Sequence, residues 1–152
     1  MTTNLNEIIT HDAVKVVHYI ISVSFLFFTV LLVARSFRGI AKNLAYTRFD
    51  KFLAVAFIVA LYLQLILGLF LFTNLGTGLD FHYMPGDGSD MVSKRLWPVE
   101  HIVLMLFALF IANLGLIFSF QTRQSQSRFK KILIYYSISV VLIVFSLLSI
   151  YA

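Results

Sequence analysis

Four long apolar stretches dominate the pattern of hydrophobic and polar positions along the chain. They cover about residues 14–34, 52–72, 97–120 and 132–151, and shorter, more polar segments separate them. A hydrocarbon core of about 30 Å requires about 20 apolar residues in a helix, so each stretch is long enough to cross it. The pattern predicts an all-α protein, a four-helix bundle that forms one transmembrane domain over residues 1–152.

Composition supports this membrane assignment. Of the 152 residues, 60% are hydrophobic and 12% are charged, and the mean hydropathy is +0.90. A soluble domain has about a quarter of its residues charged, so a water-soluble globule is excluded. The absence of cysteine also excludes disulfides, thiolate metal sites, iron–sulfur clusters and haem attached through a Cys-x-x-Cys-His motif.

The basic residues are concentrated in two of the connecting segments. Segments 35–51 and 121–131 carry nine of the twelve basic residues and a single acid, Asp50. By the positive-inside rule, both segments face the cytoplasm and both chain termini lie outside. We therefore expect an antiparallel, multi-pass protein of the bacterial inner membrane, and its net charge of +5 requires no nucleic-acid partner.

Each predicted helix carries one stripe of small or polar residues at helical spacing. Such stripes face neighbouring helices in a membrane, because small residues allow close approach and polar residues need partners. The stripes contain His18, Ser22, Phe25 and Thr29; Ala56, Ala60, Gln64 and Gly68; His101, Met105, Ala108, Ala112, Gly115 and Ser119; and Tyr135, Ser139, Ser146 and Ser149. Helix packing explains the Ala, Gly and Ser positions but not the histidines.

All four histidines, His11, His18, His82 and His101, fall in the predicted outer half of the protein. His18 and His101 also lie on inward stripes of the first and third helices. These helices run in the same direction, and the two positions are about 26 and 33 Å from the predicted inner side. A b-type haem needs one axial ligand on each face of the ring, and bundle cores commonly hold such cofactors. His18 and His101 are therefore candidate axial ligands of one haem b.

A haem at this depth also needs cations for its two propionates. Lys15, Lys94 and Arg95 are the only basic residues on the predicted outer side, and all three are close in sequence to the histidine pair. They are the candidate propionate partners.

Other interpretations of the histidines stay open. Each could be an interface residue with a local hydrogen bond, in which case the protein is a cofactor-free accessory subunit. A zinc or copper ion would be left with incomplete coordination, because Glu100 points about 100° away from His101 around the helix. The sequence does not decide whether His11 or His82 competes as a ligand.

Two amide side chains fall near the middle of the membrane. Gln64 lies on the second helix and Asn113 on the third, where an amide without a partner is costly. Each is expected to form an interhelical hydrogen bond, and Gln64 is alternatively a contact for a quinone headgroup.

Several short motifs follow one another along most of the chain. They are His18, Arg35-Ser-Phe-Arg-Gly39, Tyr46-Thr-Arg-Phe-Asp50, Gln64-Leu-Ile-Leu-Gly68-Leu, Arg95, Val99-Glu100-His101 with Met105, and Phe129-Lys-Lys131. In this order the sequence resembles a family of small bacterial four-helix membrane proteins labelled cytochrome b or cytochrome b-like. The resemblance implies a b-type haem, with His18 and His101 as the matching histidines. An Arg-Trp pair that commonly follows the first histidine is replaced here by Ser22-Val23, so Lys15 is expected to substitute for that arginine.

The sequence thus predicts a b-haem electron-transfer protein that acts near the outer, periplasmic face. Because there is no second inward histidine pair, one haem would serve one side of the roughly 30 Å core. The expected partners are the lipid bilayer and a respiratory membrane complex or quinol, and a homo-oligomer stays open. An electron carrier is favoured over an enzyme in its own right, since Glu100 is the sole candidate proton acceptor by the site.

Overall fold

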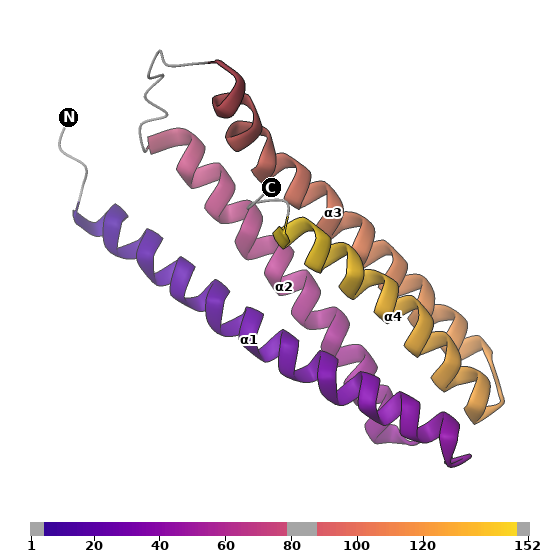
Figure 1. The fold of residues 1–152 in the computed structure, drawn as a ribbon. Coiled ribbons are helices and arrows are strands. Elements are labelled where there is room, and N and C mark those ends of the chain that lie inside the picture. Colours follow the sequence, from indigo (N-terminus) through magenta and orange to yellow (C-terminus); the bar gives the residue numbers. More distant parts are fainter. Residues whose placement is uncertain (1–4, 79–87, 149–152) are drawn as a thin grey trace.

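The computed structural model describes residues 5–78 and 88–148, and these residues form four helices (Figure 1). They are α1 (Leu5–Ala41), α2 (Arg48–Gly78), α3 (Gly88–Gln121) and α4 (Ser125–Leu148). The all-α four-helix fold is therefore confirmed. Residues 149–151 of the fourth predicted stretch lie outside the described residues.

The helices extend beyond the apolar stretches that predicted them. Helix α3 begins at Gly88 instead of near Trp97, so Pro98 lies inside the helix. Helix α4 begins at Ser125 instead of Ile132. An apolar pattern marks the part of a helix that suits the hydrocarbon core, whereas backbone hydrogen bonding continues through polar residues at either end.

Successive helices run antiparallel. The connections 42–47 and 122–124 lie at the same end of the bundle, which we call the loop end (Figure 1). Helix α1 packs against α2 and α4, and α3 packs against the same two helices. Helices α1 and α3 therefore occupy opposite corners of the bundle. Helix α4 is the shortest, with 24 residues, and ends before the level at which α3 begins (Figure 1).

The outward faces of the helices are apolar. Each helix contains a span of 23 to 26 residues, within which an 18-residue window has a mean hydropathy of at least 2.2. Phe27, Phe110 and Phe145 on these faces are 66%, 62% and 62% exposed. A surface of this kind suits lipid, because hydrocarbon removes the cost of exposing apolar side chains to water. Each helix is thus long and apolar enough to span a membrane.

Aromatic side chains fill the middle of the bundle. The Phe57 ring of α2 lies 4.8 Å from the Phe25 ring of α1 and 4.5 Å from the Tyr136 ring of α4, between ring centroids. The buried Tyr136 hydroxyl donates a hydrogen bond of 2.9 Å to the Ala54 carbonyl oxygen. A polar group buried in an apolar core needs such a partner, so this bond fixes α4 against α2.

Gly115 lies where α3 packs closely against α4. A Cβ atom at this position would lie 2.5 Å from the Tyr135 Cβ, which is itself attached directly to the α4 backbone. Gly115→Ala is therefore expected to push the two helices apart and to lower stability by about 1–3 kcal/mol, the usual cost of overpacking. Thermal unfolding of the detergent-purified protein, followed by circular dichroism, measures this change.

Gly68→Ala is the matched control for that substitution. A Cβ at Gly68 would meet its nearest neighbour, His18 Cε1, at 3.9 Å, which is an ordinary contact distance. The control should melt close to the wild-type protein. A Gly115→Ala variant that melts as high as Gly68→Ala would contradict the close approach of α3 and α4.

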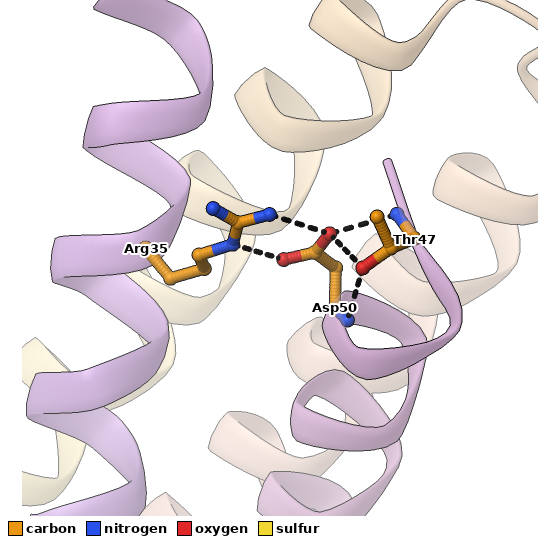
Figure 2. Close-up of polar contacts among 3 residues, drawn as sticks. All are labelled: Arg35, Thr47 and Asp50. Atoms are coloured by element: carbon orange, nitrogen blue, oxygen red, sulfur yellow. Dashed lines mark hydrogen bonds and ion pairs between the residues drawn. The ribbon is translucent and has the colours of Figure 1, made fainter. Parts of the chain in front are cut away.

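A buried ion pair connects α1 and α2 at the loop end (Figure 2). Arg35 Nε donates to Asp50 Oδ1 over 2.7 Å, and the Asp50 side chain is only 2% exposed. Asp50 Oδ2 also accepts bonds of 2.7 Å from the Thr47 backbone N–H and from its hydroxyl. Thr47 directly precedes α2, so this arrangement caps the N-terminus of that helix.

Helices α1 and α4 are tied together at the same end. The Phe129 ring of α4 lies over Gly39, where a Cβ would be 2.6 Å from the ring. Gln126 Nε2 donates a hydrogen bond of 2.6 Å to Asn43 Oδ1. Tyr46 packs edge-on against Phe129, with ring centroids 5.0 Å apart, and burial raises the pKa of the Tyr46 hydroxyl. The loop end is therefore a closely packed junction of both connections.

Candidate functional site

His18 lies on α1 in the half of the bundle away from the loop end and is half-buried. Its Nδ1 atom is buried and has no hydrogen-bond partner among the described residues. Opposite the ring is Gly68 of α2, where an added Cβ would lie 3.9 Å from His18 Cε1. A buried, unpaired imidazole nitrogen is costly unless a ligand uses it.

His101 lies on α3 and is also half-buried. Its Nδ1 atom is 2.7 Å from the hydroxyl oxygen of Ser146 on α4, and Ser146 is fully buried. The contact holds the imidazole in one orientation. Histidines that bind a metal through one ring nitrogen usually engage the other nitrogen in a contact of this kind.

The two histidines lie on helices at opposite corners of the bundle. Helices α1 and α3 are diagonal neighbours, separated by α2 and α4, and side chains from opposite corners can meet in the centre. Both His18 and His101 lie in the half of the bundle away from the loop end, and both are half-buried. Residues 83 positions apart in the sequence thus lie in the same half of the bundle, on opposite helices.

Gln64 connects α2 to α1 beside His18. Its Nε2 donates to the Ser22 hydroxyl over 2.5 Å and to the His18 carbonyl oxygen over 3.3 Å. The interhelical hydrogen bond expected for this buried amide is therefore present. Gln64 Oε1 is buried and has no hydrogen-bond partner among the described residues. The core therefore holds an unpaired acceptor oxygen next to the turn of α1 that contains His18.

Asn113 forms an interhelical hydrogen bond to α2 that is longer than those of Gln64. Its Nδ2 donates to the Leu109 carbonyl oxygen on its own helix over 2.8 Å and to the Tyr62 hydroxyl of α2 over 3.4 Å. This amide is thus satisfied largely within α3.

The three predicted propionate partners fall on helices, but their side chains lie outside the described part of the structure. Lys15 belongs to α1, and Lys94 and Arg95 belong to α3. Of the other histidines, the His11 side chain and the whole of His82 also lie outside the described residues.

A metal ion held by several side chains finds no support in the described residues. No group of three or more His, Asp or Glu side chains gathers there, and Glu100, the carboxylate adjacent to His101, is exposed. The donor set near the core is a pair of imidazoles.

That pair is chemically suited to haem, which needs one axial nitrogen ligand on each face. The unpaired Nδ1 of His18 and the Ser146 contact of His101 both fit such a role. The cavity of about 10 Å³ beside Asp50 and Tyr46 lies at the loop end, away from both histidines, and is not part of this candidate site.

Ser146 and Ser22 form contacts that the sequence pattern does not predict. Both were identified as stripe residues, and the structure places them in contact with His101 and Gln64. A serine on an inward stripe can contact a polar residue of a neighbouring helix when the two lie at the same height along the bundle. The relative height of two helices depends on their ends and their tilt, which the sequence does not specify.

The chain was also compared with known proteins. Comparisons with protein-family models, with curated proteins and with solved structures give no match. The fold and the two half-buried histidines of α1 and α3 are therefore the findings on which a functional assignment must rest.

Proposed function

We propose that this protein binds one b-type haem and transfers electrons in a membrane, with His18 and His101 as the two axial ligands. The observation that carries the proposal is a pair of half-buried imidazoles on opposite helices, in the same half of the bundle. The resemblance of the sequence motifs to small cytochrome b-like proteins supports the same assignment. A bound haem would supply a centre that accepts and releases one electron.

The surrounding residues have distinct tasks in this proposal. Ser146 orients the His101 imidazole through its 2.7 Å contact. Gln64 and Ser22 hold the His18 turn of α1 against α2. Gly68 offers no side chain opposite His18, so the imidazole can adjust as the ring enters. Lys15, Lys94 and Arg95 would neutralise the propionates.

The place and the partners follow from the charge pattern. With the loop end in the cytoplasm of a bacterium, the histidine pair lies toward the periplasmic side of the inner membrane. A single centre there suits exchange with a respiratory complex or a quinol on that side. The unpaired Gln64 Oε1 is an acceptor that a quinol hydroxyl could use.

Haem titration of the purified full-length chain tests the proposal. Haemin is added to detergent-solubilised protein, and the reduced-minus-oxidised spectrum is recorded at each step. We expect a b-type spectrum that saturates at about one haem per chain. A chain that stays colourless after haem addition would contradict the proposal.

The alternative is a cofactor-free accessory subunit. The contact between His101 and Ser146 favours it, because that contact satisfies a polar group in the core without any ligand. In that case His18→Gln and His101→Asn, which keep polar side chains, should leave the melting temperature and partner binding nearly unchanged, and haem titration should show no specific spectrum.

A further inference from the structure

Exposed cations surround the loop end of the bundle. Arg38 and Lys42 lie at the end of α1, Arg48 at the start of α2, Arg123 between α3 and α4, and Lys130 in the first turns of α4. All five residues are exposed. We call this set the basic surface.

The basic surface has no acid to neutralise it within the described residues of the loop end. Asp50, the one carboxylate in segments 35–51 and 121–131, is buried and already bound by Arg35 and Thr47. The charge of the basic surface therefore remains available for an anion from outside the chain.

Three further cations at this end are already engaged. Lys51 Nζ lies 4.9 Å from the centroid of the Phe120 ring. Lys131 Nζ donates to the Phe118 carbonyl oxygen over 3.2 Å, and Arg128 Nε donates to the Thr122 carbonyl oxygen over 2.5 Å. These bonds satisfy carbonyl groups in the last turn of α3 and directly after it, where cations are favourable. Arg128 and Lys131 are therefore not counted in the basic surface.

The basic surface lies around the ends of the apolar spans. These spans end at Ala41 and Gln121 and begin at Arg48 and Ser125. Lys42 and Arg123 therefore lie just beyond a span end, Arg48 begins a span, and Arg38 and Lys130 lie within five residues of a span end. Clusters of four to eight basic residues directly beside membrane spans attract anionic lipids. A soluble acidic protein would have to reach the same residues through the headgroup layer.

The backbone that carries two of these lysines is held rigidly. Asn43, which follows Lys42, accepts a hydrogen bond of 2.6 Å from Gln126, and Lys130 is one helical turn after Gln126. The packing of Phe129 on Gly39 fixes the same junction of α1 and α4. Lys42 and Lys130 are thus mounted on one preorganised support, which lowers the cost of binding a shared anion.

We propose that the basic surface binds the headgroups of anionic phospholipids, with Lys42 and Lys130 on either side of the α1–α4 junction as principal contacts. The occupant is a lipid of the surrounding leaflet, selected by its net negative headgroup. This binding does not depend on haem and is independent of the function proposed above.

Native mass spectrometry of the full chain in detergent tests the proposal. The protein is incubated with equal amounts of phosphatidylglycerol and phosphatidylcholine, and the retained lipid is counted. We expect phosphatidylglycerol to be retained several-fold over phosphatidylcholine. The double variant Lys42→Gln/Lys130→Gln should lose most of this preference, at roughly fivefold per charge, whereas Lys42→Arg/Lys130→Arg should keep it.

Circular dichroism melting establishes that both double variants are folded, and inorganic phosphate at the same concentration is added as a competitor. Equal retention of the two lipids by the wild-type protein would overturn the proposal, as would an unchanged preference in the glutamine variant. Displacement of the lipid by inorganic phosphate would assign the surface to a free anion and would also overturn it.

Discussion

His18→Ala and His101→Ala are each expected to abolish the b-type reduced-minus-oxidised spectrum of the purified protein. Each substitution removes one of the two half-buried imidazoles of α1 and α3. Loss of a direct ligand should weaken haem binding beyond the roughly 10- to 100-fold typical for the loss of a residue that only supports a ligand. Haem content per chain, measured after purification and after haemin titration, gives the result.

Ser146→Ala provides a graded comparison. It removes the hydroxyl that lies 2.7 Å from His101 Nδ1 but leaves both imidazoles in place. We expect weaker haem binding, within the roughly 10- to 100-fold range of a supporting residue, with a b-type spectrum still present.

His11→Ala and His82→Ala are the matched controls, since they remove the same side chain from positions outside the proposed pair. Both variants should retain haem at the wild-type level. Retention of haem by all four alanine variants, or its loss in His11→Ala or His82→Ala instead, would disprove the assignment of His18 and His101 as the ligands.

Labelling of introduced cysteines is expected to give an all-or-none result for the two ends of the bundle. The chain has no cysteine of its own, so Ser89→Cys and Ala45→Cys each provide one thiol. With the loop end in the cytoplasm, an impermeant thiol reagent added to intact cells should label position 89 and leave position 45 unlabelled. Opening the membrane should then allow labelling at position 45.

Ala45 is the better site in its connection because it is exposed. The neighbouring Asn43 has a φ of 51° and accepts the hydrogen bond from Gln126, so a cysteine there would disturb the junction. Labelling at position 45 in intact cells, with protection at position 89, would show that the topology is the reverse of the one proposed. The histidine pair would then lie toward the cytoplasmic side.

Most of the fold could be predicted from the hydrophobic pattern. Four apolar stretches of membrane-spanning length define four helices, and the short connections between the first two and the last two require antiparallel neighbours. The helix ends could not be predicted in the same way. Gly88 and Ser125 begin α3 and α4 well before the apolar stretches, because polar residues can extend a helix beyond the hydrocarbon core.

His18 and His101 were expected on inward stripes, and both are half-buried. The contacts of His101 with Ser146 and of Gln64 with Ser22 were not expected. Which serine reaches His101 depends on the level of α4 relative to α3, and that level is set by close approaches such as Gly115 against Tyr135. The Arg35–Asp50 ion pair was missed for a similar reason, since the connection 42–47 determines how α2 turns back on α1. These features depend on tertiary geometry rather than on local pattern.

The electron paramagnetic resonance spectrum of the oxidised, haem-loaded full-length protein tests the central claim most directly. Two imidazole ligands, one from His18 and one from His101, should give a low-spin ferric signal, and His18→Ala and His101→Ala should each remove it. A high-spin ferric signal in the wild-type protein, or a low-spin signal that persists in either alanine variant, would contradict the ligation proposed for this bundle.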